Sequence, residues 1–272
     1  MKNQKRALRR IKRALRALLG SAPTLQEATG AGRVFELYVM FRLAVALKAR
    51  GWLVTPLDSN GSPLIPGQPF IQRGGLPSGV SPAIAGPASG ASSLKIEKNG
   101  QEWELWNGVQ FKGRSGAKHE LDIAVVSHAL ANALRVPSAL GASERFAFGR
   151  PRVGIECKDV QASGSPDEMR ALIARMYDLT ILRGHRRHLG LTLDGEIYDP
   201  EPGGSGFGLS TVTYLEQNSR CKTALVRRSK LSKGAGDMTS LFKISPHVEV
   251  THPSVQATAM ADELAHWMDA NL

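Results

Sequence analysis

The segments LDIAVV (residues 121–126) and RVGIECK (residues 152–158) decide the fold expected for this chain. Both are short runs rich in β-branched residues, which is the pattern of buried strands. A hairpin precedes them, because residues 94–106 contain the turn Asn99-Gly100 between two strand-like runs. Helical patterns lie on both sides of this group of strands, so we expect an α/β fold built on a mixed sheet.

Three helical patterns flank or follow these strands. Residues 34–47 are apolar on nearly every side, which predicts a helix that is buried among other elements. Residues 165–184 form an amphipathic pattern, with Ser165 placed as the N-cap and Pro166 at the first helical position. The chain ends in a further helical pattern at residues 254–272.

Length and composition favour a single α/β domain over residues 21–272. A chain of 272 residues with 42% apolar residues allows one large domain or two small ones. Residues 56–93 are rich in Pro, Gly and Ser and predict a long loop or linker-like insertion. Two more strands are expected, at residues 188–193 and, more weakly, at 222–228.

The first 20 residues stand apart by their charge. They contain eight of the 35 basic residues and no acidic residue, in a chain of net charge +11. Leu8, Ile11, Leu15 and Leu18 predict a basic amphipathic helix. This helix could dock on its own or a partner subunit with its basic face solvated. The alternatives are an arm that binds phosphates, and a membrane-surface helix or organelle transit peptide.

Charged residues interrupt the two central strands. Regular alternation would place Glu120 and Asp122 on one face of the first strand, and Leu121 and Ile123 on the other. The same rule would place Glu156 and Lys158 on the outward face of the second. Carboxylates in otherwise apolar strands are costly unless they are neutralised. If the two strands pair, these charged faces meet.

A divalent cation would neutralise such a group. Hard cations bind carboxylates and backbone carbonyls and keep positions for water or phosphate oxygen, and a neighbouring lysine can orient water or stabilise charge. Glu36, the only acid in the apolar helix, is a further candidate, because a buried carboxylate needs a cation. The alternative is structural: Glu156 and Lys158 form a surface ion pair, Asp122 ends its strand, and Arg33 pairs with Glu36.

These residues carry a resemblance to a known superfamily. Asp122, the string IECK at residues 155–158, and a preceding helix that bears Glu36 resemble the PD-(D/E)XK phosphodiesterases. IECK is particularly similar to the type IV restriction branch. The resemblance spans roughly residues 33–195, and Leu121 stands where the motif has its proline. It implies a restriction-endonuclease-like fold, in which helices flank a mixed β-sheet core.

The resemblance also implies a set of functional residues. Asp122, Glu156, Glu36 and the carbonyl of Cys157 would bind one or two Mg²⁺ ions, for which Mn²⁺ would substitute. Lys158 would help to position the hydrolytic water. The same four side chains, Glu36, Asp122, Glu156 and Lys158, would form the catalytic set.

The implied activity is metal-dependent hydrolysis of DNA phosphodiester bonds, in bacterial restriction or anti-phage defence. The chain would act as a homodimer or within a larger defence complex, and RNA stays open as a substrate. One alternative is a catalytically inactive nucleic-acid-binding or scaffold subunit with the same fold. Another is an assembly protein whose basic first helix docks on the acidic last helix of a neighbouring subunit, at Asp262, Glu263 and Asp269.

Two basic clusters are candidate contacts for the DNA backbone. They lie in RGHRRH (183–188) and VRRSKLSK (226–233), and their members are Arg183, Arg186, Arg187, Arg227, Arg228 and Lys230. The alternatives are a complement to a helix C-terminus for the first cluster and a solvated face for the second.

Other chemistries have no motif in the sequence. There is no Walker loop, dinucleotide fingerprint or serine elbow, so ATP, NAD and acyl-enzyme chemistry are not expected. The seven histidines do not cluster with cysteine, which argues against zinc. Two cysteines cannot build a disulfide framework, which favours the reducing cytoplasm. No apolar run has the length of a membrane span, and arginines interrupt the first apolar stretch, so neither a membrane nor a secretory signal is expected.

Overall fold

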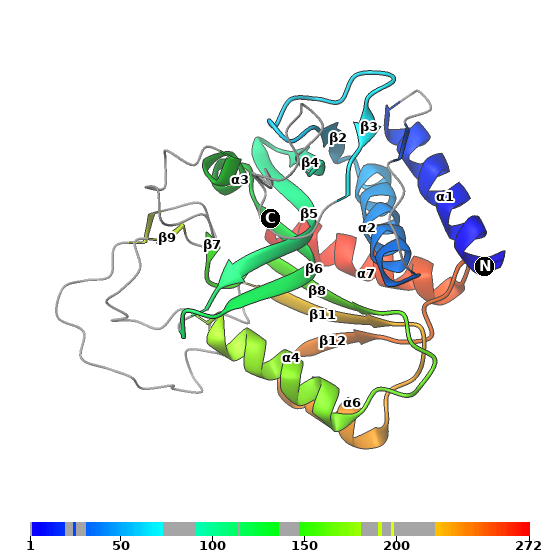
Figure 1. Cartoon of the computed structure of the whole chain (residues 1–272), viewed down its shortest axis with the longest axis vertical. Coiled ribbons are helices and arrows are strands. Elements are labelled where there is room, and N and C mark those ends of the chain that lie inside the picture. Colours follow the sequence, from blue (N-terminus) through cyan, green and yellow to red (C-terminus); the bar gives the residue numbers. More distant parts are fainter. Residues whose placement is uncertain are drawn as a thin grey trace, which may run out of the picture.

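The computed structural model shows an α/β fold in which a mixed sheet lies between two groups of helices (Figure 1). The structure describes residues 2–19, 24–25, 31–72, 91–113, 115–135, 147–180, 190–191, 197–198 and 221–272. Statements about the structure below concern these residues.

The main sheet has the strand order β12-β11-β8-β6-β5-β4-β2, with the short β7 beside β5. Strands β8, β11 and β12 are mutually parallel, whereas β8, β6, β5, β4 and β2 pair antiparallel in turn. The strands are β2 (Leu53–Leu57), β4 (Ser93–Lys98), β5 (Gln101–Lys112), β6 (Lys118–Ser127), β7 (Ala147–Phe148), β8 (Val153–Lys158), β11 (Lys222–Arg227) and β12 (Ile244–His247). Two small pairs lie outside it: β1 (Thr24–Leu25) with β3 (Pro69–Phe70), and β9 (Gly190–Leu191) with β10 (Ile197–Tyr198).

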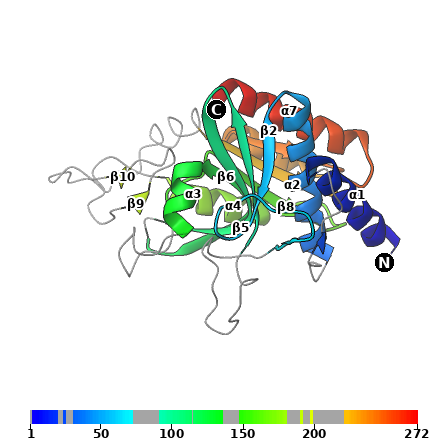
Figure 2. The same ribbon diagram turned by 90° about the horizontal axis from the view of Figure 1, so that it is seen from above.

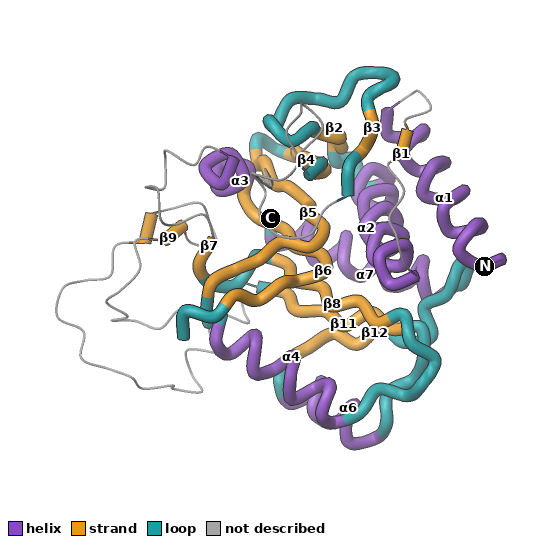
Figure 3. The backbone as a smooth tube through the Cα atoms, viewed as in Figure 1, coloured by secondary structure: helices purple, strands orange, loops and turns teal. Residues whose placement is uncertain are grey.

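Helices cover both faces of this sheet (Figures 2 and 3). On one face lie α1 (Lys2–Leu19), α2 (Ala31–Ala49) and α7 (Val255–Asn271), which share one apolar core with the strands. On the other face α3 (His128–Arg135), α4 (Pro166–Asp178) and α6 (Lys233–Leu241) share a second core. Because both faces are covered, the central strands are buried on both sides, as their continuous apolar runs require.

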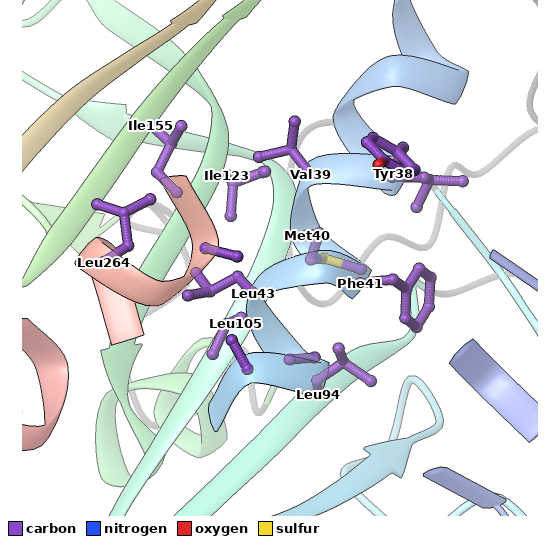
Figure 4. Close-up of a cluster of buried hydrophobic side chains, with 14 of the residues drawn as sticks. Tyr38, Val39, Met40, Phe41, Leu43, Leu94, Leu105, Ile123, Ile155 and Leu264 are labelled. Atoms are coloured by element: carbon purple, nitrogen blue, oxygen red, sulfur yellow. The ribbon is translucent and has the colours of Figure 1, made fainter. Parts of the chain in front are cut away.

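Helix α2 is the centre of the larger core. The close-up in Figure 4 shows its side chains beside those of the strands and α7, with Leu43, Ile123, Ile155 and Leu264 drawn together. All four are fully buried. The expectation of a helix buried on most sides is therefore confirmed.

The expected hairpin is also confirmed. Strands β4 and β5 pair across Asn99 and Gly100, whose φ angles of 53° and 77° are those of a type I′ turn. Strand β5 continues beyond the predicted end at residue 106 to Lys112.

A kink in the sheet changes the expected alternation. On β5, Leu105 belongs to the core beneath α2, whereas Val109 belongs to the core on the α4 side, although an even spacing should keep both on one face. On β6, Leu121 and Ile123 are split in the same way. Gly108, between the two halves of β5, has φ of 66°, which a residue with a side chain rarely adopts. The prediction that Leu121 and Ile123 share a face is therefore wrong.

Other elements differ from the sequence-based expectations. Helix α4 begins as predicted, with the side chain of Ser165 accepting from the backbone N–H of Glu168, but it ends at Asp178. The weak strand at 222–228 is β11, which lies inside the sheet beside β8. Strand β2, helix α6 and strand β12 were not predicted. Within the expected insertion at 56–93, residues 73–90 lie outside the described residues.

Helix α1 packs against its own chain. Ala7, Ile11 and Leu15 are fully buried, and Leu8 and Leu18 pack partly against the same core. The predicted apolar stripe is thus used in docking on α2. No helix among the described residues is long and apolar enough to cross a bilayer.

Candidate functional site

The two strands that carry the predicted site are neighbours in the sheet. Strands β6 and β8 pair antiparallel, with Ile123 opposite Ile155 (Figure 1). Continuing this register places Asp122 and Glu156 at the next position along the pair. The expectation that the charged segments of the two strands meet is confirmed. We refer to Glu36, Asp122, Glu156 and Lys158 as the carboxylate site.

Asp122 is held in place by the backbone of β8. Its Oδ2 accepts a hydrogen bond of 2.7 Å from the backbone N–H of Cys157. Burial, together with the negative charges of Glu156 and Glu36, raises the pKa of Asp122 to about 7. The hydrogen bond from Cys157 and the charge of Lys158 oppose the rise without cancelling it. The carboxyl group of Asp122 therefore lacks sufficient positive charge around it.

Glu156 points into the protein and not outward as alternation on an open sheet would suggest. Its side chain is 4% exposed, because α4 covers this face of the sheet. Its Oε1 contacts Lys158 Nζ at 2.6 Å and Arg175 Nη2 at 2.7 Å. Its Oε2 is buried and has no hydrogen-bond partner among the residues that the structure describes. One carboxylate oxygen of Glu156 thus contacts two cations, and the other contacts none among the described residues.

Glu36 enters the site from α2. Its Oε2 accepts from Arg33 Nη1 at 3.0 Å and from Asn107 Nδ2 at 3.2 Å. Asn107 is fixed in turn, since it also donates to the carbonyl of Asp122 and its Oδ1 accepts from Gln72. Burial raises the pKa of Glu36, although Arg33 and Asn107 act in the opposite direction. The expected Arg33–Glu36 pair is present, and Glu36 is connected to Asp122 through Asn107.

Lys158 and Cys157 differ in their exposure. The Lys158 side chain is 34% exposed. Burial would lower its pKa, but the ion pair with Glu156 outweighs burial and raises it, so Lys158 is protonated at neutral pH. The Cys157 side chain is buried in the core beneath α2, and burial raises the pKa of its thiol well above the usual value. The thiol is therefore neutral, and a contribution of this residue to ion binding would come from its carbonyl.

The surroundings of the carboxylate site have an excess of negative charge. Glu120 adds a fourth carboxylate, which pairs with Arg33 at 3.1 Å. Within the described part of the chain, the cations in contact with these groups are Arg33, Lys158 and Arg175. Four carboxylates face three cations, which agrees with the raised pKa of Asp122.

As placed, the side chains of the described residues form no ready group of three ligands for an ion. The donor set nevertheless fits a hard divalent cation, because it consists of carboxylate oxygens. One of these oxygens, Glu156 Oε2, is buried without a partner, and the nearby Asp122 keeps its proton up to about pH 7. A bound divalent cation would give Glu156 Oε2 a partner, and it would favour the ionised form of Asp122.

The residues predicted to contact DNA differ in their burial and in their partners. Arg227 is fully buried: it forms an ion pair with Glu168 and donates to the carbonyl of Ala162. A role for Arg227 at the DNA backbone is therefore wrong, since its guanidinium is enclosed by protein between β11 and α4. Arg228, one residue further, pairs with Asp159 at 2.8 Å and stays partly exposed.

The rest of this cluster is open to solvent or not described. The Lys230 side chain is 71% exposed and lies 3.7 Å from Glu249. Arg183, Arg186 and Arg187 lie outside the described residues.

Three residues of the site were not predicted: Gln72, Asn107 and Arg175. Asn107 had a visible signal, because it interrupts the apolar run of β5 directly before Gly108. Arg175 lies on the side of α4 that faces the sheet, where its Nη1 also donates to the carbonyl of Glu120. Gln72 follows β3 inside the Pro- and Gly-rich stretch at residues 56–93, where the sequence gives no pattern.

Comparison with known proteins adds no relative: no protein-family model, curated protein or solved structure matches this chain. The function must therefore be argued from the geometry of the site.

Proposed function

We propose that this protein is a divalent-metal-dependent nuclease that hydrolyses phosphodiester bonds in DNA, with a restriction-endonuclease-like fold. The observation that carries the proposal is the charge around Asp122: the charges of Glu156 and Glu36 both act on it, and four carboxylates in this region face three cations among the described residues. An ion pair that only stabilises the fold needs no excess of negative charge. A site that binds a metal cation does need this excess.

Mg²⁺ is the ion that suits this donor set, and Mn²⁺ would substitute for it. Asp122 and Glu156 would hold the ion together with the Cys157 carbonyl, and Glu36 would complete the set from α2. The bound ion would supply Lewis-acid activation of water and stabilise the negative charge that develops on a phosphate.

The chain's own residues would prepare the site for this task. Lys158 is protonated and part-exposed, so it can donate to a phosphate oxygen or orient a water molecule. Asn107 keeps Glu36 and the Asp122 backbone at a fixed separation through its two hydrogen bonds. Arg175 holds Glu156 from the α4 side. The biological setting would be restriction or anti-phage defence in bacteria.

One observation favours a second candidate, a catalytically inactive nucleic-acid-binding subunit. Glu156 Oε1 is occupied by both Lys158 and Arg175, as in an ion pair that only stabilises the fold. In that case the chain would bind DNA without binding Mg²⁺ at this place.

Plasmid cleavage in the presence and absence of Mg²⁺ separates the two candidates. We expect Mg²⁺-dependent cleavage by the unaltered chain and a loss of at least about 100-fold for Lys158→Ala, the scale on which single charged catalytic groups act. Lys95→Ala is the matched control, because Lys95 forms a similar lysine–carboxylate pair on β4, three strands away from β8. Cleavage that survives in Lys158→Ala at the level of the control would exclude this site.

A further inference from the structure

Helix α1 carries arginines that the carboxylate site does not use. Arg6, Arg9, Arg10 and Arg13 line a surface hollow of about 290 Å³ together with Pro253. Arg6, Arg9 and Arg13 are exposed, and Arg10 is partly buried. We call these four residues the arginine face.

The arginine face has no acidic partner in the described structure. Residues 1–20 contain no acidic residue. Among the ion pairs formed by described residues, none includes a basic residue of α1. This is unlike the basic residues of the main sheet and α4, most of which are paired. An uncompensated row of guanidinium groups is available to an external anion.

The position of α1 connects this face with the carboxylate site. Lys48, near the end of α2, donates to the carbonyl of Ala17 near the end of α1. Arg10, in the first half of α1, hydrogen-bonds with Tyr38 in the first half of α2. The two helices therefore run in the same direction, and the arginine face lies beside the start of α2, the part that carries Glu36. Figure 1 shows the N-terminus of α1 next to the loop that leads into α7.

His252, in that loop, lies in the positive field of nearby arginines. Its ring packs against Tyr38 with 4.3 Å between ring centroids. Burial, together with the positive charges of Arg228 and Arg10, lowers the pKa of His252 to about 4. The charges of α1 and of Arg228 therefore both act on this loop; Arg228, which pairs with Asp159, directly follows β11, the neighbour of β8 in the sheet.

We propose that the arginine face of α1 binds the sugar-phosphate backbone of duplex DNA on its way to the carboxylate site. This inference rests on the proposed function, since it assigns the approach of the same substrate. Arg6 and Arg13 are seven residues apart, or about 10 Å along the helix. At about 3.4 Å of duplex axis per phosphate in each strand, this length corresponds to about three phosphates. The planar guanidinium fork suits phosphate oxygens.

The structure disfavours the other partners of a basic amphipathic helix. A membrane-surface helix must insert its apolar face, but Ala7, Ile11 and Leu15 are already buried against α2. In the acidic helix of a second copy, two of the three acidic residues already have neighbours of their own, and Glu263 lies 3.7 Å from Lys222 and 3.9 Å from His247. Asp269 of α7 is engaged by Lys98 and by the indole N–H of Trp52.

The test compares DNA binding by two full-length variants of equal charge. In Arg6→Gln/Arg9→Gln/Arg13→Gln the arginine face loses three charges, while the buried residues of α1 and the Arg10–Tyr38 contact are kept. In Arg50→Gln/Arg170→Gln/Lys243→Gln three charges are removed elsewhere on the molecule. Fluorescence anisotropy with a short labelled duplex is measured in EDTA, so that no cleavage interferes, over a series of KCl concentrations. Thermal unfolding of both variants confirms that they fold.

We expect the arginine-face variant to bind DNA more weakly and to lower the slope of log K against log[KCl] by about 3, or about one for each arginine. The control variant should match the unaltered chain. Equal slopes and affinities for the two variants would overturn the inference, and so would equally tight binding of poly-glutamate by the unaltered chain. If the predicted slope change occurs but Mg²⁺ cleavage does not, this inference stands and the proposed activity fails. If Mg²⁺-dependent cleavage occurs but the slopes are unchanged, the proposed activity stands and this inference fails.

Discussion

Replacing Asp122 by Asn should stabilise the metal-free protein at high pH. In the folded state burial and the neighbouring carboxylates raise the pKa of Asp122 from 3.8 to about 7. Asn has the same shape and keeps an acceptor for the N–H of Cys157, but it carries no charge. The substitution therefore removes the cost of an ionised Asp122 and little else.

The magnitude follows from the shift in pKa. A difference of about three units, at about 1.4 kcal/mol per unit, corresponds to an upper limit of about 4 kcal/mol. The folded state binds the proton more tightly than the unfolded state, so stability is greatest below pH 3.8 and falls as the pH rises to about 7. The gain from Asp122→Asn should thus be small near pH 4, grow towards pH 7 and stay constant above it.

Urea unfolding in EDTA across this pH range measures the effect. The exposed Asp262→Asn in α7 is the control and should show no such trend. Adding Mg²⁺ should stabilise the unaltered chain and not Asp122→Asn. If Asp122→Asn is destabilising above pH 7, or if its effect does not depend on pH, the account of the carboxylate site as an electrostatically strained group is refuted.

Three further outcomes are expected. His252 should stay neutral down to about pH 4, so stability should fall as the pH drops from 6.5 to 4, and Arg10→Gln should raise the pKa of His252 in an NMR titration of its ring protons. Arg227→Gln should lower the free energy of unfolding by about 3 kcal/mol, because it leaves Glu168 without its buried partner, while DNA affinity per folded molecule stays the same, as urea unfolding and anisotropy would show. Ile11→Ala should cost about 2 to 5 kcal/mol and release α1, detected as faster amide exchange in that helix.

Much of the architecture follows from local patterns. The apolar run of α2, the Asn99-Gly100 turn and the Ser165-Pro166 helix start each have a short-range cause, and each was predictable. The pairing of β6 with β8 entered the sequence analysis as a condition for the site, and the structure shows that the two strands do pair.

The remaining features depend on contacts between distant residues. The side-chain alternation fails at Gly108, whose φ angle is a property of the folded sheet. Arg227 looked like a surface cation in sequence, yet α4 covers it. Glu156 is buried and paired with Arg175 only because α4 lies across β8. The local sequence of neither α4 nor β8 predicts that packing. The charged residues were identified and the burial of Glu36 was expected, but the burial of Glu156 and Arg227 was not.

The central claim is that a divalent cation binds between β6, β8 and α2. An anomalous difference map from crystals soaked in Mn²⁺ tests it most directly. The account predicts a peak within coordination distance of carboxylate oxygens of both Asp122 and Glu156. A map with no peak there, in crystals where the Lys158–Glu156 contact persists, would contradict it.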